Sequence, residues 1–295
     1  MYQYDFMAIG LCGQSVFLSV PHFHAPEETL HAVTMVTEPG GKAYNQAVAG
    51  TRLGGSVCFA GAVGEDEEAR ICGSVLKEAG VNRAILVKKP GERTAYACIL
   101  TDQNGANRVT VYPGASRLLC AADIRSMSAA IRDSAILLLT CELSEEAFQQ
   151  AVEIADRSGV KVLLNPAPYQ PWVKDYLTKV WCVTPNADEA RRLFGWERGD
   201  LTISRPLPDS LTVVITNGAD GACLGAGGEL IHFPAPRVHA ADTTGAGDAF
   251  NAALALCTAR GASISDAVKA AIASASQSVQ FPHVIESYRH LMPLY

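Results

Sequence analysis

The feature that most restricts the fold of this chain is a regular alternation of apolar and helical segments between residues 135 and 216. Apolar runs of strand length are separated there by segments in which apolar residues recur at helical spacing. Strands that alternate with helices form right-handed βαβ units around a mostly parallel sheet, with helices on both faces. We therefore predict an α/β fold. The expected strands are Ala135 to Thr140, Val160 to Asn165, Val180 to Thr184 and Leu211 to Thr216, and the expected helices are Glu145 to Arg157, Gln170 to Thr178 and Ala187 to Phe194.

The N-terminal part of the chain has a less regular pattern, in which short apolar runs are interrupted by Pro and Gly. Asp102-Gln103-Asn104-Gly105 separates two strand-like runs and is a strong hairpin signal. We predict a single α/β domain over residues 1–295, with a small β lid drawn from about residues 12–37 and 91–116. The further strands expected are Phe6 to Ile9, Phe17 to Val20, Leu30 to Val36, Ser56 to Val63, Ala84 to Val87, Thr94 to Thr101 and Asn107 to Tyr112; the further helices follow Gly40-Gly41 and span Glu67 to Ala79.

Composition and charge argue against several classes of function. The 295 residues include 48% hydrophobic and 18% charged residues, as in ordinary globular proteins, and the net charge is -6. Nucleic acid or an anionic membrane needs a basic face, so we expect neither as a partner. Nine cysteines without a Cys-x-x-Cys pair are typical of reduced thiols in the cytosol. With no signal-peptide pattern and no apolar run long enough to cross a bilayer, we expect a cytoplasmic protein.

The stretch from Ala240 to Phe250 carries the strongest chemical signal. Its Gly-Ala-Gly-Asp run lies where a loop turns into a helix, and the first amides of a helix attract anions. Gly245 and Gly247 permit a positive φ and a close approach to the main chain. The carboxylate of Asp248 would repel a phosphate unless it takes a proton from a hydroxyl that attacks that phosphate. This predicts phosphoryl transfer. The alternative is that Asp248 only caps the helix and that the glycines only allow tight packing.

Residues 242–248 have the form Asp-Thr-x-Gly-Ala-Gly-Asp, which resembles the C-terminal signature of the ribokinase-like (PfkB) carbohydrate kinases. The resemblance covers nearly the whole chain and implies a three-layer ribokinase-like fold. It implies that Asp248 is the general base and that Gly245, Ala246 and Gly247 form the hole for the transferring phosphoryl group. It also implies that Asp242 belongs to a site for a monovalent cation such as K⁺.

A second segment, Gly40-Gly41-Lys42-x-x-Asn45-x-Ala47, resembles the N-terminal signature of the same family. Exposed amides at the glycines, with Lys42 and Asn45 as donors, are suited to hold sugar hydroxyls at a helix start. The alternative is a surface lysine and an asparagine at the start of a helix. The resemblance also assigns Glu142 to the sugar, so the expected substrate contacts include Gly41, Lys42, Asn45 and Glu142.

The nucleotide side is predicted from two further elements. Asn186 and Glu189 match an Asn-x-x-Glu element of the family and could order Mg²⁺ beside the phosphates, although the same pair forms a helix capping box. Thr216-Asn217-Gly218 ends a predicted strand and resembles the family's nucleotide-binding turn, which assigns Thr216 and Gly218 to ATP. Its alternative is an ordinary Asn-Gly turn.

The substrate end of the resemblance departs from the family pattern. These kinases usually have Asn-x-Asp after the first strand, and the carboxylate holds two substrate hydroxyls; Gly13 and Ser15 stand at those positions here. Ser15 keeps a hydrogen-bonding group but loses charge-assisted bonds worth about 1.5–3 kcal/mol each. Residues 273–282 also lack the usual glycine near the adenine and cation contacts.

Together these features predict an ATP- and Mg²⁺-dependent kinase that phosphorylates a hydroxyl of a small sugar or sugar-like molecule. The alternatives are a catalytically idle binding or regulatory protein with the same fold, and a kinase for a nucleoside or a phosphosugar. A homodimer formed through exposed strands of the lid is also plausible on this sequence, because exposed sheet edges invite pairing.

Overall fold

The computed structural model describes residues 2–195, 211–226 and 229–294. Its centre is a nine-stranded sheet with the order β13-β12-β11-β10-β9-β8-β1-β4-β5. The strands from β5 to β11 in this order pair in parallel, and β12 and β13 add an antiparallel edge. The strands are β1 Tyr4–Ile9, β4 Val57–Val63, β5 Arg83–Lys88, β8 Ser134–Thr140, β9 Lys161–Asn165, β10 Cys182–Val183, β11 Thr212–Thr216, β12 Ala222–Ala226 and β13 Glu229–Phe233.

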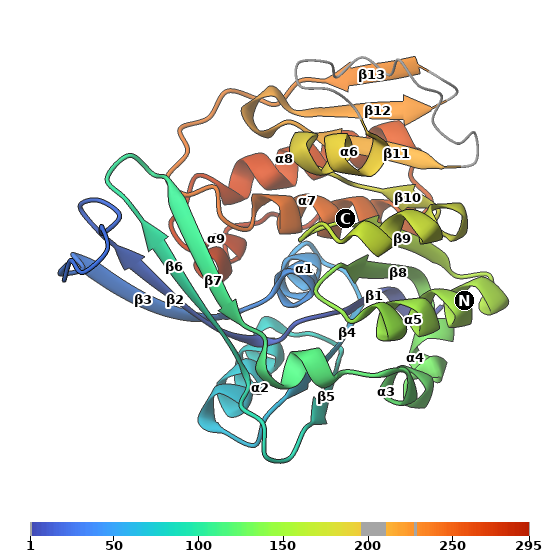
Figure 1. Ribbon diagram of the computed structural model, residues 1–295. Helices are drawn as coiled ribbons and strands as arrows, with labels where there is room; N and C mark the ends of the chain where they lie inside the picture. Colours follow the sequence, from blue (N-terminus) through green and yellow to red (C-terminus); the bar gives the residue numbers. More distant parts are fainter. Residues whose placement is uncertain (1, 196–210, 227–228, 295) are drawn as a thin grey trace.

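Helices cover both faces of this sheet (Figure 1). Because strand side chains alternate between faces, neighbouring residues of one strand enter different cores. Phe6 and Ala8 pack with α1, α2, α7, α8 and α9, whereas Met7 and Ile9 pack with α3, α4, α5 and α6. The predicted α/β fold is confirmed. The helices are α1 Lys42–Arg52, α2 Glu67–Ala79, α3 Ala121–Ser126, α4 Ser128–Arg132, α5 Glu145–Ser158, α6 Ala187–Phe194, α7 Ala246–Ala259, α8 Ile264–Ser278 and α9 Val284–Tyr288, with 3₁₀ turns η1 Gly114–Leu118, η2 Pro171–Lys179 and η3 Gly218–Asp220.

A second sheet of four strands projects from the body at the left of Figure 1. Its order is β3-β2-β6-β7, and β2 pairs with β3 so that Ser15 faces Glu38 across the ladder. The predicted hairpin is confirmed, because the turn from Asp102 to Gly105 joins β6 to β7 and Gly105 has a φ of 78°. The strands are β2 Gly13–Ser19, β3 Thr34–Gly40, β6 Ala95–Thr101 and β7 Asn107–Tyr112.

Some predicted boundaries are wrong where the tertiary pairing decides them. The strand expected at Leu30 to Val36 begins at Thr34 and runs to Gly40, because its ladder with β2 ends at the pair Ser19 and Thr34. The helix expected at Gln170 to Thr178 is the 3₁₀ segment η2, which starts with Pro171 and packs aromatic rings against α5. Within the described ranges, no helix is both long and apolar enough to span a membrane.

Candidate active site

The start of α7 is a tight turn that exposes main-chain donors. Gly245 is the N-cap residue with a φ of 79°, and a Cβ there would lie 2.6 Å from the hydroxyl of Tyr288. The hydroxyl of Tyr288 donates to the Gly245 carbonyl at 2.8 Å, which ties α9 to this turn. Gly247 is already helical and does not adopt the positive φ that a glycine permits. A Cβ on Gly247 would meet nothing within 4 Å, so the space beside this residue is open.

Two amide side chains of α1 hold the carboxylate of Asp248. Asn45 Nδ2 donates to Asp248 Oδ2 at 2.9 Å, and Gln46 Nε2 donates to Asp248 Oδ1 at 3.1 Å. Burial raises the pKa of Asp248 above its usual value, although the attraction of Lys42 and the two amide bonds act in the opposite direction. A carboxylate with a raised pKa is a better proton acceptor, so the geometry suits a general base.

Lys42, the first residue of α1, lies among three carboxyl groups. Burial lowers its pKa, but the attraction of Asp248, Glu142 and Glu189 outweighs this and the pKa is raised. The amide of Lys42 also donates to Glu142 Oε2 at 3.0 Å. Burial raises the pKa of Glu142 to about 7, with the charge of Lys42 acting in the opposite direction. The ammonium group of Lys42 therefore lies among the carboxyl groups of Asp248, Glu142 and Glu189, near the starts of α1 and α7.

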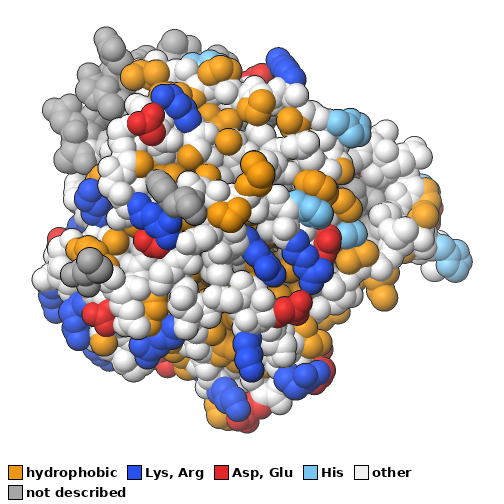
Figure 2. All heavy atoms as spheres, turned by 180° about the vertical axis from the view of Figure 1, so that it is seen from behind, with side chains coloured by type: hydrophobic (Ala, Val, Ile, Leu, Met, Phe, Trp, Pro, Cys, Tyr) orange, Lys and Arg blue, Asp and Glu red, His pale blue; other side chains and the backbone are white. Residues whose placement is uncertain are grey.

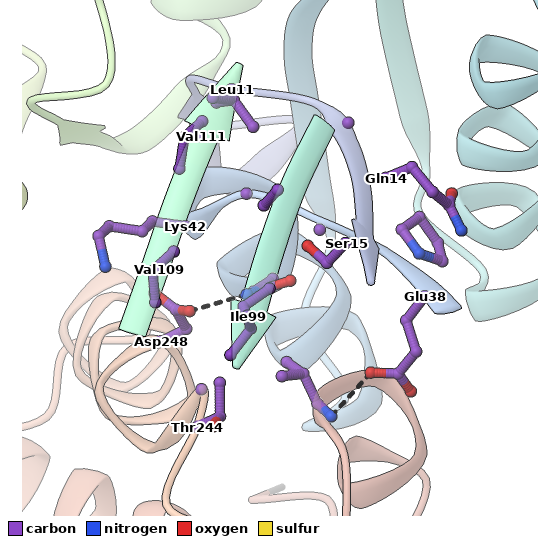
Figure 3. A pocket seen from close by; sticks show the side chains of 18 of the residues that line it. Leu11, Gln14, Ser15, Glu38, Lys42, Ile99, Val109, Val111, Thr244 and Asp248 are labelled. Atoms are coloured by element: carbon purple, nitrogen blue, oxygen red, sulfur yellow. Dashed lines mark hydrogen bonds between the residues drawn. The ribbon is translucent and has the colours of Figure 1, made fainter. Parts of the chain in front are cut away.

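The small sheet covers a cavity of about 460 Å³ above Asp248 (Figure 3). Figure 3 shows Ile99, Val109 and Val111 forming an apolar side of this cavity, with Lys42 and Asp248 at its polar end. The predicted substrate residues Ser15, Gly41, Lys42, Asn45 and Glu142 all line it. The Oδ1 atom of Asn45 is buried without a hydrogen-bond partner in the described part of the chain, so it remains available as an acceptor for a ligand hydroxyl.

A second cavity of about 310 Å³ lies on the other side of the α7 start. Thr216 and Gly218 line it together with Phe250 and Ile272, so the cavity joins a polar turn to an apolar floor. A third space of about 150 Å³ shares Lys42, Gly245 and Asp248 with the first cavity and Thr216 and Gly247 with the second. Asp248 therefore lines the first cavity and the small space that connects it with the second cavity.

Asn186 and Glu189 line the connecting space, and they also form the capping box of α6. Their contacts are mutual, with Asn186 Oδ1 accepting from the Glu189 amide at 2.8 Å and Glu189 Oε2 accepting from the Asn186 amide at 2.9 Å. The geometry of Asn186 and Glu189 therefore fits both interpretations, a helix capping box and a pair that orders Mg²⁺. Among the described residues the second carboxylate oxygen of Glu189 accepts no hydrogen bond, so it can bind water or a cation, and oxygen ligands are those that Mg²⁺ prefers. Among the residues that the structure describes, no group of three or more His, Cys, Asp and Glu forms a ready metal cage.

Asp242 lies in the loop before α7, outside these cavities' linings. Its two oxygens accept from the amides of Thr244 at 2.9 Å and His283 at 3.2 Å. The carboxylate thus joins this loop to the segment before α9. It gives a cation fewer unengaged oxygens than an open carboxylate would.

A cavity and a connecting space that share a carboxylate at a helix start suit an enzyme that transfers a phosphoryl group between two ligands. Residues 5–290 match the family model "pfkB family carbohydrate kinase", and the chain belongs to this family. The ribokinase of Haemophilus influenzae is 32% identical over 268 residues, which cover 89% of this chain and 88% of the relative.

Solved structures agree with this assignment. The ribokinase of Thermotoga maritima has a TM-score of 0.82 at 30% identity, with 96% of this chain and 95% of that chain covered. The Arabidopsis thaliana ribokinase, solved in complex with ribose and ATP, has a TM-score of 0.82 at 25% identity, with coverage of 98% and 95%. The predicted class, a carbohydrate kinase with this fold, is confirmed.

Several residues of the site lay beyond the reach of sequence reasoning. Gln46 contacts Asp248 across 202 positions of the chain. Glu38 lines the cavity of about 460 Å³ from β3 and accepts from the amide of Val284 at 2.9 Å (Figure 3). The only local signal for Gln46 was its place beside Asn45 in a helix start, and Glu38 had none.

Proposed function

We propose that this protein transfers the γ-phosphoryl group of ATP to a hydroxyl of a small sugar, with Asp248 as the general base. The observation that carries the proposal is the position of Asp248 at the start of α7, where it lines both the first cavity and the space that connects this cavity with the second. The family membership and the ribose and ATP bound to the Arabidopsis relative support both ligands.

In the proposed reaction the acceptor hydroxyl gives its proton to Asp248 as its oxygen attacks the γ-phosphorus. A new O–P bond forms, the bond to the bridging oxygen of ADP breaks, and the electrons of that bond leave with ADP. Amides of Gly245 and Gly247 and the ammonium of Lys42 would stabilise charge on the transferring group. The Ala246 amide donates to the Thr243 carbonyl at 3.3 Å, so a phosphoryl oxygen must compete for it.

The acceptor would be held at the polar end of the large cavity. Asn45 Oδ1 and Glu142 would accept from its hydroxyls, while Lys42 and the main chain at Gly41 would donate. Ser15 would contribute one hydroxyl where relatives of this family usually place a carboxylate. Near Asp248 the acceptor would therefore meet the charged groups of Lys42 and Glu142, whereas Ser15 would offer it a neutral hydroxyl.

The nucleotide would lie in the second cavity, with Thr216 and Gly218 beside it and its phosphates in the connecting space. Mg²⁺, held through Asn186 and Glu189 or their waters, would supply charge neutralisation for the β- and γ-phosphates. Asp242 would be the protein ligand of a monovalent cation. A KCl titration of turnover against matched NaCl tests that part, because a bound K⁺ gives a saturable rise in rate.

We infer that the four-stranded sheet is the lid of a single domain, because it covers the substrate cavity and excludes water that would compete as acceptor. Its other face carries exposed apolar side chains, including Met35 at 68% and Tyr112 at 46% exposure. Figure 2 shows this projecting part at the right, with apolar and His side chains at its surface. A homodimer through this sheet would cover them, and sedimentation of the wild type against Met35→Lys tests it.

The direct experiment is ADP release over a panel of pentoses, deoxypentoses, hexoses, nucleosides and phosphosugars. We expect acceptor-dependent ADP release with at least one free sugar, and a phosphomonoester product in ³¹P NMR spectra. Reactions without acceptor give the ATPase background. If the protein binds ATP but no acceptor on the panel raises ADP release, the protein acts as an idle binding protein and the proposal is wrong.

A further inference from the structure

Behind the carboxylate of Asp248 lies a buried amide that lines none of the three cavities. Gln46 is 0% exposed, and its Nε2 lies 3.1 Å from Asp248 Oδ1 and 3.3 Å from Asn165 Oδ1. Both of these neighbours are acceptors, so the nitrogen rather than the oxygen of the Gln46 amide must face them. Both hydrogens on this nitrogen are therefore committed.

The hydrogen bonds continue from Asn165 back to the start of α7. Asn165 Nδ2 donates to the Thr184 carbonyl at 3.3 Å, and the Thr184 hydroxyl donates to Asn251 Oδ1 at 2.5 Å. Asn251 Nδ2 then donates to the carbonyl of Gly247 at 2.8 Å. The network thus begins at Asp248 and returns to the residue before it, and all its side chains are buried. Displacing one member breaks bonds made by its neighbours.

The oxygen of the Gln46 amide is not stabilised by this network. Its Oε1 is buried and has no hydrogen-bond partner among the described residues. An unsatisfied buried oxygen destabilises a fold, and an apolar side chain of the same length would avoid that cost. Packing alone therefore does not account for a glutamine here, whereas its contact with Asp248 does.

We propose that Gln46 is a positioning residue for phosphoryl transfer, which holds Oδ1 of Asp248 so that the carboxylate stays ionised and oriented toward the acceptor hydroxyl. This inference rests on the proposed function of Asp248 as the base. Asn45 holds the other oxygen but also lines the substrate cavity, so a bound sugar can compete for it. Gln46 is out of a ligand's reach, so its bond persists through the catalytic cycle.

Other charged or titratable groups also face Asp248 and must stay constant in a test. Lys42 on α1 attracts the Asp248 carboxylate and also attracts Glu142 after β8 and Glu189 on α6. The charge of Asp248 also acts on the hydroxyl of Tyr288 on α9. A variant at position 46 leaves all four in place. Because burial raises the pKa of Glu142 to about 7, each pH profile is repeated in a Glu142→Gln background to assign the acid limb to Asp248.

The first test is Gln46→Met, which keeps the length of the side chain and removes both donors. We expect kcat to fall about 10- to 100-fold, and the acid limb of the kcat profile to move up by about one pH unit, because the ionised carboxylate loses a donor. The KM for ATP should change less than about twofold, since Gln46 does not line that cavity. Asn165→Ser removes the other acceptor of the Gln46 Nε2 group, so Gln46 is held less firmly. This variant should move the acid limb of the kcat profile in the same direction but by less.

Val152→Ala on α5 is the control for lost stability, because this residue is buried in the core on the other face of the sheet. It should weaken the fold without moving the pH profile. If Gln46→Met also lowers stability but leaves the acid limb where it was, Gln46 has only a structural role and the proposal is wrong.

A double-mutant cycle keeps the test independent of turnover. The folding equilibrium constants of wild type, Gln46→Met, Asp248→Asn and the double variant are measured by urea unfolding at pH 8 and at acidic pH. We expect the two substitutions to be coupled by about tenfold at pH 8, and the coupling to shrink once Asp248 is protonated. Additive effects at both pH values would overturn the positioning role. If the cycle shows coupling and no acceptor is phosphorylated, only the proposed function has failed.

Discussion

The start of α7 and the small sheet face the same cavity, but they are held by different forces. Asp248 is 7% exposed, and both of its oxygens accept from amide side chains. Across the cavity, Val109 and Val111 are 59% and 48% exposed, and Ser15 offers one hydroxyl. The difference suggests that reaction chemistry depends on the preorganised α7 side, whereas acceptor choice depends on the sheet side. Changes at the α7 side should therefore affect kcat or the pH response, and changes at the sheet side should affect KM.

After the loss of Asp248 itself, the largest effect is expected for Lys42→Met. It removes the cation that lies among Asp248, Glu142 and Glu189, so the proton affinities of the carboxylates rise and the transferring phosphoryl group loses a positive partner. We expect kcat to fall about 100- to 1000-fold in the ADP-release assay. Lys77→Met, on the exposed side of α2, is the control and should be neutral. A Lys42→Met enzyme within about twofold of wild type would remove the lysine from the mechanism.

Glu142→Gln should change how stability depends on pH. Folded Glu142 keeps its proton up to a pKa of about 7, against 4.5 as its ordinary value. Between these values the unfolded chain binds fewer protons, so the free energy of unfolding falls as pH rises, by about 3 kcal/mol in total. Urea unfolding from pH 4.5 to 8 should show a flatter curve for Glu142→Gln than for wild type. The exposed Glu146→Gln is the control, and parallel curves for all three proteins would contradict the raised pKa.

Ser15→Asp should strengthen acceptor binding on the side of the cavity that the small sheet forms. A carboxylate at this position would accept charge-assisted bonds from two neighbouring hydroxyls. We expect the KM for a pentose acceptor to fall about tenfold with kcat nearly unchanged. Ser15→Asn, of equal size but neutral, should improve KM less. Equal effects of Asp and Asn would show that charge at this position does not decide acceptor binding.

The smallest effect is expected for Glu38→Ala. The Glu38 carboxylate accepts from the amides of Val284, Ile285 and Glu286, and so joins β3 to α9. Losing these bonds should lower the free energy of unfolding by about 1 kcal/mol. Urea unfolding measures this, with the exposed loop variant Glu65→Gln as the control. No loss of stability would mean that the sheet is held to the body by other contacts.

The same contrast explains what could be predicted from the sequence. Asp248, Gly245 and Lys42 lie in short contiguous motifs, and the chemistry of a helix start is a local property. The strands from β8 to β11 were predicted because apolar periodicity is also local. Gln46 and Glu38 act through partners 202 and 246 positions away, and a single sequence gives no signal for such contacts. The first residue of β3 was missed for a related reason, since its pairing with β2 sets the start.

The most direct test of the account compares acceptor-dependent ADP release by wild type and Asp248→Asn at saturating ATP, with ATP affinity measured in parallel. We expect kcat of Asp248→Asn to fall about 100- to 10,000-fold, because the acceptor hydroxyl loses its base. The Kd for ATP should stay within about twofold of wild type. Near-normal turnover by Asp248→Asn would show that Asp248 is not the general base.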